Sequence, residues 1–333
     1  MRRALFLGTS ANLVGKIWIV ISQLISIPVL MSSFGKEGFG VWVMLSTLPT
    51  YLALSDIGLS AAAAVEVRKA TSLRNYALAG RVYCTVWTVL TSLSAVIGAA
   101  FYFVSLPIMG YSESIDAHVG SLWRTLLVVA AYAFFILQSQ FFSAGIRATD
   151  RYAKGTVLMD LCTFLETLLV VLVAAMAGSI FLCFLAALIF RVCISFFLYI
   201  VLTAGHSWMS LRLQFPNIKE LQGLLHPSLG SFTLVVASGI GIQGIVVSLG
   251  ACFGPGAAAA YSVTRTVTRI PHQLSSLFAR ASIPEFTRTY TLGRTDVFRR
   301  LIVWNYLVCA AVLGLSGVFL FTFGDYVVHK LSS

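Results

Sequence analysis

The sequence predicts an all-α protein, a bundle of helices that crosses the membrane many times. Hydrophobic residues make up 58% of the 333 positions and charged residues only 11%, whereas about 25% of a soluble domain is charged. The apolar runs are also long and continuous, which favours spanning helices over the roughly ten-residue alternating segments of a membrane barrel. Composition and run length therefore indicate a polytopic membrane protein.

About twenty residues of apolar helix cross a bilayer, and by that measure the chain contains nine candidate spans. They lie at 11–31, 38–63, 82–106, 123–146, 156–177, 180–203, 229–250, 257–278 and 301–323. The long polar connection after the sixth span divides them unequally. We expect an N-terminal lobe of six helices at 1–205, a cytoplasmic linker at 206–228 and a C-terminal lobe of three helices at 229–333. The second lobe is expected to be incomplete.

The basic residues predict the orientation of the chain. If the N-terminus is cytoplasmic, sixteen lysines and arginines fall on the cytoplasmic side, against Lys36, Arg124 and Lys330 on the other. Lys and Arg concentrate in cytoplasmic loops, so we expect a bacterial inner-membrane protein with its N-terminus inside. This distribution accounts for most of the net charge of +11, and we expect no nucleic-acid partner.

An internal repeat is suggested by a shift of 219 residues. The shift places Phe34-Gly35 on Phe253-Gly254, and Glu66 on Glu285. Repeated halves are common in transporters, which bind substrate between them. Two unrelated helical hairpins would give the same outline.

Four basic residues fall inside predicted spans, namely Lys16, Arg191, Arg265 and Arg269. A charge at this depth costs a few kcal/mol, so such residues usually face a cavity or another polar group. Arg265 and Arg269 are four residues apart on one helical face, and their guanidinium groups suit a phosphate. A structural polar seam between helices, or a helix lying at the membrane surface, is the alternative.

Lys16 and Arg191 have simpler interpretations as well. Lys16 lies about one turn inside the first span, where its side chain can extend to the head groups or contact a substrate. Arg191 is central in the sixth span. It can contribute to a cationic cavity, and Asp160 or Glu166 is its natural ion-pair partner.

Three acids within the spans are candidates for ion pairing or for coupling transport to an ion. Asp160 and Glu166 share the fifth span and can pair with Arg191 or carry a proton or Na⁺. Asp56 can cap a helix that restarts before Leu59, pair with Lys16 or take part in coupling. We expect no metal site, because the six cysteines lie in or beside apolar runs without a metal-binding spacing. We also expect no catalytic residue and no cofactor.

Several segments resemble a known family. They are FGKEGFGVW at Phe34–Trp42, YLALSDIGLSAAA at Tyr51–Ala63, the turn Gly254-Pro255-Gly256 and SIPEFTR at Ser282–Arg288. With these segments, the chain resembles the polysaccharide (O-antigen) flippases of the multidrug/oligosaccharidyl-lipid/polysaccharide exporter superfamily.

The resemblance implies a two-lobed bundle, typically of twelve helices, that works by alternating access. Its expected substrate is an isoprenoid-pyrophosphate-linked oligosaccharide, moved across the inner membrane for surface polysaccharide export. Expected partners are this substrate, membrane lipids and other polysaccharide-assembly proteins. In such proteins the first and eighth helices supply basic residues to a central cavity, and Lys16, Arg265 and Arg269 fall on those helices here. The chain differs from the family pattern in ending after nine spans.

Two other functions are compatible with a polytopic membrane protein. A multidrug or cation exporter of the same fold should line its cavity with acids and aromatic residues, whereas the clearest polar stripe here is basic. A membrane enzyme that uses a polyprenyl phosphate needs a large polar loop with paired carboxylates or a similar catalytic set. The loops of this chain hold no such set, so we expect a transporter and not an enzyme.

Overall fold

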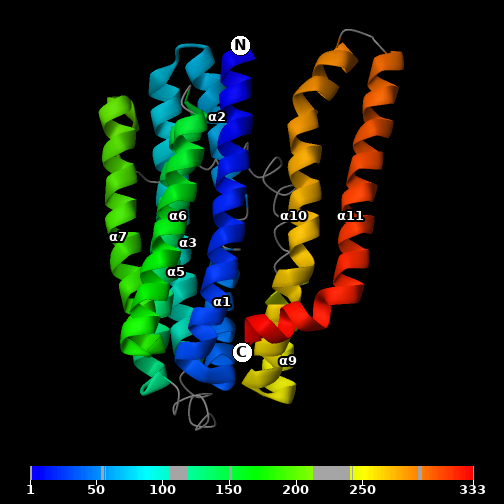
Figure 1. Ribbon diagram of the computed structural model, residues 1–333. Coiled ribbons are helices and arrows are strands. Elements are labelled where there is room, and N and C mark those ends of the chain that lie inside the picture. Colours follow the sequence, from blue (N-terminus) through cyan, green and yellow to red (C-terminus); the bar gives the residue numbers. More distant parts are fainter. Residues whose placement is uncertain are drawn as a thin grey trace.

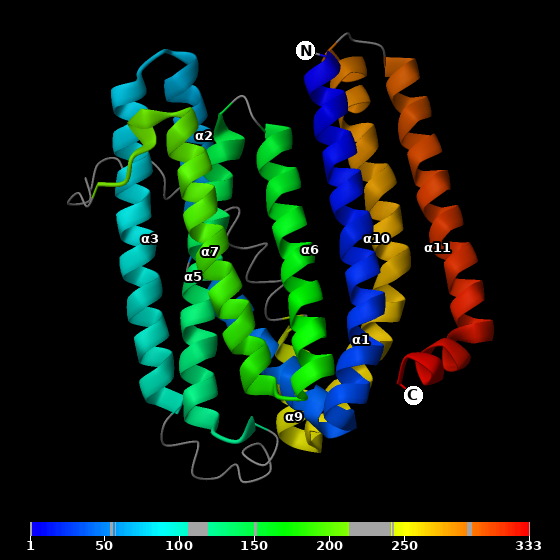
Figure 2. The same cartoon turned by 60° about the vertical axis from the view of Figure 1, so that its left-hand side comes forward.

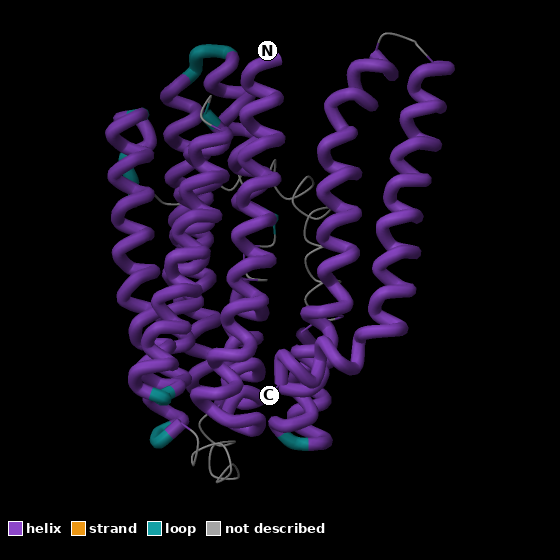
Figure 3. Tube along the Cα trace, viewed as in Figure 1, coloured by secondary structure: helices purple, strands orange, loops and turns teal. Residues whose placement is uncertain are grey.

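The computed structural model describes residues 2–53, 56, 58–105, 119–149, 152–212, 241, 243–291 and 295–332. Within these ranges the chain forms nine α-helices and one short 3-10 helix, and no strand is present among the described residues (Figures 1 and 3). The helices are α1 (Arg2–Ala53), α2 (Leu59–Ser72), α3 (Tyr76–Ser105), α5 (Leu122–Ala148), α6 (Tyr152–Ala177), α7 (Ile180–Gly205), α9 (Gly244–Phe253), α10 (Pro255–Thr291) and α11 (Thr295–Ser332), and η3 (Ser207–Met209) is the 3-10 turn.

Six described helices are long and apolar enough to cross a membrane. Their spanning parts are Trp18–Tyr51, Tyr76–Ala100, Leu122–Ala148, Lys154–Ala177, Ile180–Gly205 and Thr295–Gly324. This confirms the predicted all-α membrane bundle. The expected spans 123–146, 156–177 and 180–203 agree closely with α5, α6 and α7.

The expected spans 11–31, 82–106 and 301–323 correspond to parts of α1, α3 and α11. The other three differ from the structure or lie largely outside its described part. The expected span 38–63 is not one helix, because α1 ends at Ala53 and α2 begins at Leu59. The expected span 257–278 lies within α10, which is not among the six apolar helices because polar residues interrupt its hydrophobic run. Most of the expected span 229–250 lies outside the described residues.

Two glycine turns share one backbone conformation. Gly35 interrupts α1 with φ 71° and ψ 174°, and Gly254 joins α9 to α10 with φ 86° and ψ 168°. Positive φ with extended ψ is accessible almost only to glycine, so each helix must break at this point. Since both glycines follow a phenylalanine and are 219 residues apart, the structure supports the repeat at these turns.

The two glycine turns also pack against one another. A Cβ atom at Gly40 would lie 1.9 Å from the carbonyl oxygen of Pro255, and a Cβ at Gly250 would lie 2.4 Å from Sδ of Met44. Buried side chains of α1 and α10, including Met31 and Val263, continue this contact. The first helix and the C-terminal helices are therefore held together at this end of the bundle.

Most of the buried core lies among helices α1 to α7, and Figure 2 shows α3, α5, α6 and α7 side by side. Tyr83 of α3 stacks on Phe141 of α5 with ring centroids 4.6 Å apart, and Gly145 leaves room for the tyrosine ring. On the other side of α1, the long helices α10 and α11 run beside each other (Figure 1). Residues 213–240 lie outside the described part, so the division at 205 and 228 stays a prediction.

One end of the bundle is rich in basic residues. Arg68 and Lys69 end α2, Arg81 begins α3 and Arg147 ends α5. The N-terminus lies at this same end, as do the start of α11 and its Arg299 and Arg300 (Figures 1 and 2). We refer to it as the basic end. Such a concentration marks the cytoplasmic side, and it supports the expected orientation, which stays a prediction.

Candidate functional site

The polar face of α10 carries Arg265 and Arg269 on successive turns. Arg265 is half-buried, whereas the Arg269 side chain is exposed. The guanidinium carbon of Arg265 lies 5.9 Å from the centre of the Tyr261 ring, within the range of a cation–π contact. The ring therefore orients the inner arginine, while the outer one stays accessible.

Acidic residues are absent from the facing parts of α1 and α10. Residues 1–36 and 255–284 contain neither Asp nor Glu. The two helices pack together, and Gln273 of α10 lies 3.4 Å from the side-chain oxygen of Gln23. Val263 and Val267 form the buried side of α10, and Val263 packs with Ile27 and Met31 of α1. At 3.6 residues per turn the two arginines lie on the other side of the helix. Lys16 lies on α1 as expected, but its side chain lies outside the described part of the structure.

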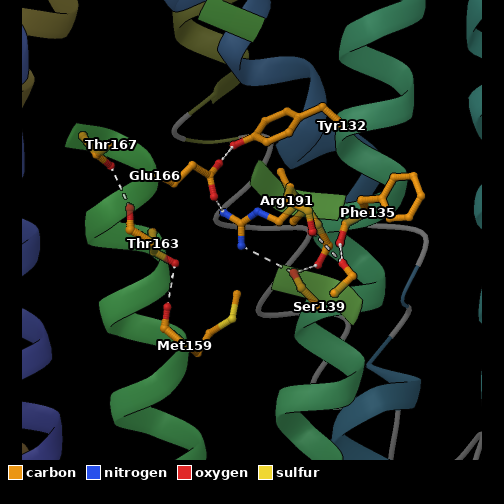
Figure 4. Close-up of polar contacts among 10 residues, drawn as sticks. Tyr132, Phe135, Ser139, Met159, Thr163, Glu166, Thr167 and Arg191 are labelled. Atoms are coloured by element: carbon orange, nitrogen blue, oxygen red, sulfur yellow. Dashed lines mark hydrogen bonds and ion pairs between the residues drawn. The ribbon is translucent and has the colours of Figure 1, made fainter. Parts of the chain in front are cut away.

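A buried ion pair links α6 to α7 (Figure 4). Glu166 and Arg191 form a salt bridge, and each residue is only 4% exposed. The Tyr132 hydroxyl of α5 donates to the second oxygen of the same carboxylate. Arg191 also donates to the Ser139 hydroxyl over 3.4 Å. Three helices therefore meet at one charge-compensated polar cluster.

This cluster answers the question of which acid pairs with Arg191. Glu166 is the partner, whereas the Asp160 carboxylate lies against α1, where a Cβ at Gly15 would be 1.8 Å from its Oδ2 atom. Ser195, one turn after Arg191, donates to the Phe135 carbonyl over 3.2 Å and ties α7 to α5 beside this cluster. Ion pairing is thus the role that the geometry shows for Arg191, and a direct substrate contact stays a prediction.

A cavity of about 320 Å³ lies beside the ion pair, between α1, α5, α6 and α7. Its lining combines Glu166 and the Tyr132 ring with the hydroxyls of Ser46, Thr50 and Thr167. These groups can hydrogen-bond water or a small polar group, but the carboxylate is already neutralised by Arg191. The expected coupling roles of Asp160 and Glu166 stay predictions.

Asp56 has a local structural function. Its Oδ1 atom accepts a hydrogen bond from the Ser60 backbone N–H over 2.9 Å, which satisfies one of the free donors at the start of α2. The left-handed residue Gly58, with φ 72°, allows the chain to turn into this helix. Asp56 therefore makes a capping contact from two residues before the N-cap Gly58, and its roles in pairing with Lys16 or in coupling stay predictions.

Several parts of this arrangement have no signal in the sequence. Tyr132 and Ser139 resemble ordinary residues of an apolar helix, and only the packing of α5 on α6 and α7 brings them to the ion pair. Within the described ranges, no group of three or more His, Cys, Asp or Glu residues is placed to hold a metal ion.

The fold corresponds to that of known membrane transporters. A multidrug resistance MATE family transporter of the MOP superfamily, in an inward-facing conformation, is similar with a TM-score of 0.71 and 14% sequence identity, over 97% of this chain and 75% of that chain. An outward-facing MATE family transporter gives 0.65 and 15%, over 99% and 76%. A MOP superfamily transporter from Pyrococcus furiosus Vc1 (DSM3638) gives 0.65 and 14%, over 98% and 73%.

These similarities define the class: the chain has the MATE transporter fold. It spans about three quarters of the length of the solved structures that it matches. No family model and no curated protein matches the sequence. At 14–15% identity the comparisons show the fold alone, and the resemblance to polysaccharide flippases stays a prediction.

Proposed function

We propose that the protein moves an isoprenoid-pyrophosphate-linked oligosaccharide across the bacterial inner membrane for surface polysaccharide export, by alternating access. The observation that carries this proposal is the pair Arg265 and Arg269 on one face of α10, within a stretch at 255–284 that contains no acid. Two adjacent guanidinium groups suit the two phosphate groups of a pyrophosphate.

The charge of the pyrophosphate explains why basic side chains are needed along its path. An unpaired pyrophosphate cannot enter hydrocarbon, because burying its charge without partners costs many kcal/mol. Charge-assisted hydrogen bonds from Arg265, Arg269 and Lys16 would replace its hydration. The sugars would occupy a water-filled space between the N-terminal and the C-terminal lobe, and the isoprenoid chain could remain in lipid.

The packing of α1 on the C-terminal helices supports alternating access. The contacts between them run from the two glycine turns to Gln23 and Gln273. The end that holds the turns is thus closed, and the larger TM-score belongs to the inward-facing transporter. With the basic end on the cytoplasmic side, this arrangement would open the substrate path toward the cytoplasm.

Export of a cationic drug is the second candidate function, because similar solved structures include multidrug transporters. Two of the three candidate acids are engaged here, since Glu166 is paired and Asp56 caps α2. The MOP superfamily transporter from Pyrococcus furiosus is described as having a binding pocket of reverse polarity that suggests a different function. A change of pocket polarity on this fold therefore has a precedent.

Ligand binding to the purified chain separates the two candidates. The probes are farnesyl pyrophosphate, farnesol and ethidium, each measured by calorimetry in detergent. We expect farnesyl pyrophosphate to bind and Arg265→Ala/Arg269→Ala to raise its Kd at least tenfold, because each lost charge-assisted hydrogen bond costs ~1.5–3 kcal/mol. The control Thr264→Ala/Thr268→Ala alters exposed neighbours on the same helix and should leave Kd unchanged. Preferential binding of ethidium would favour the drug exporter.

A further inference from the structure

A second basic pocket lies away from α10, where α2, α5 and α6 meet. It has a volume of about 620 Å³ and is lined by Arg68 of α2, Gln140 and Arg147 of α5, Met159 of α6 and the capping residue Asp56. Arg147 is the penultimate residue of the spanning segment Leu122–Ala148. The pocket therefore lies near the end of an apolar helix of spanning length, at the basic end of the bundle.

The two arginines of this pocket are available for a ligand. Neither guanidinium makes a hydrogen bond or ion pair with any residue in the described ranges. The nearest acid on α2, Glu66, is instead bonded to Lys69 at 2.5 Å. Two cations that share a pocket and form no ion pair with a protein carboxylate make a favourable place for a phosphate.

The position of Arg147 is fixed by the helix beside it. A Cβ at Gly155 of α6 would lie 2.9 Å from Cγ of Arg147, so the glycine makes room for the arginine stem. The Ser143 hydroxyl donates to the Gly155 carbonyl over 3.2 Å and ties the two helices at this level. The cationic group is therefore attached to a packed helix crossing and not to a loose surface chain.

The pocket is also apolar on one side, which favours a lipid over free phosphate. Ala64, Val65, Ala144 and Met159 contribute this side, and Val65 is 55% exposed. Basic pockets between transmembrane helices on the cytoplasmic side are suited to lipid head groups. We infer that the pocket between α2, α5 and α6 binds the phosphate of a lipid head group through Arg68 and Arg147.

Asp56 adds a selectivity to this site. Its Oδ1 atom is occupied by the Ser60 N–H, and its negative charge shares the pocket with the two arginines. A phosphoethanolamine head group can place its phosphate at the arginines and its ammonium near the carboxylate. The phosphate can come from such a membrane phospholipid or from the pyrophosphate of the proposed transport substrate, and the two sources are separable by experiment.

Native mass spectrometry of the purified full-length chain tests the site. The protein is delipidated, then mixed with palmitoyl-oleoyl phosphatidylethanolamine, the matching phosphatidylglycerol or farnesyl pyrophosphate. We expect Arg68→Gln/Arg147→Gln to reduce retention of phosphatidylethanolamine at least tenfold. The control Arg299→Gln/Arg300→Gln removes two exposed arginines from the start of α11 and should retain the lipid. Asp56→Asn keeps an oxygen for Ser60 and should lower the preference for phosphatidylethanolamine over phosphatidylglycerol.

The outcomes distinguish this inference from the proposed transport function. If the Arg68/Arg147 variant loses phospholipid but still binds farnesyl pyrophosphate, the site takes membrane lipid. If it loses farnesyl pyrophosphate instead, the site is where the substrate pyrophosphate docks. Unchanged retention of all three compounds overturns the inference. The transport proposal is tested separately, because its variants change only Arg265 and Arg269.

Discussion

Removing Arg191 should destabilise the protein strongly, because it leaves the Glu166 carboxylate buried without its countercharge. Both residues are 4% exposed, and breaking a buried pair by deleting one partner costs about 3–5 kcal/mol. The Tyr132 hydrogen bond remains and does not neutralise the charge. At ~2 °C per kcal/mol for a chain of this size, Arg191→Met should lower Tm by roughly 6–10 °C.

The double-mutant cycle makes this prediction specific. Glu166→Leu/Arg191→Met replaces both charges with apolar side chains, so it should be more stable than Arg191→Met alone. Thermal unfolding in one detergent, followed by tryptophan fluorescence, measures all variants. Arg124→Met, which removes an exposed arginine of α5, should change Tm by less than ~2 °C. An unchanged Tm in Arg191→Met, or additive losses in the double variant, would refute the reasoning.

Other predictions follow from the turns, the cap and the orientation. Gly40→Ala should loosen the contact with Pro255 and destabilise the closed end by about 1–3 kcal/mol. Cysteines introduced at Lys36 and Gly256 should then form a cross-link more slowly, and an unchanged rate of cross-linking would count against this prediction. Asp56→Ala should cost ~1 kcal/mol in thermal unfolding, whereas Asp56→Asn should cost less, since only alanine removes the acceptor for the α2 backbone. A cysteine at Leu73, which is 80% exposed, should resist an impermeant reagent added outside intact cells; labelling there would reverse the proposed orientation.

The sequence was sufficient for the helices whose hydrophobic runs are unbroken. The ranges 123–146, 156–177 and 180–203 became α5, α6 and α7 because continuous apolar runs of this length have one stable arrangement in a membrane. It was less informative where a helix breaks within a run. The gap between Ala53 and Leu59 depends on Gly58 and on the cap from Asp56, which the hydrophobic pattern does not show.

The candidate sites were predictable as residues but not as contacts. An arginine in the middle of an apolar run must find a partner, so Arg191 could be singled out from the sequence alone. The choice of Glu166 over Asp160 depends on how α6 and α7 face each other, and the third contact comes from Tyr132 on α5. Packing between distant helices decides such details.

The most direct test of the proposed function measures translocation itself. The purified chain is reconstituted in proteoliposomes with a fluorescent short-chain isoprenoid pyrophosphate, and a membrane-impermeant quencher reports the fraction that has crossed. We expect the wild type and Thr264→Ala/Thr268→Ala to move this lipid, and Arg265→Ala/Arg269→Ala to slow it at least tenfold. Equal rates in the arginine variant, or transport of ethidium without transport of the isoprenoid pyrophosphate, would contradict the account.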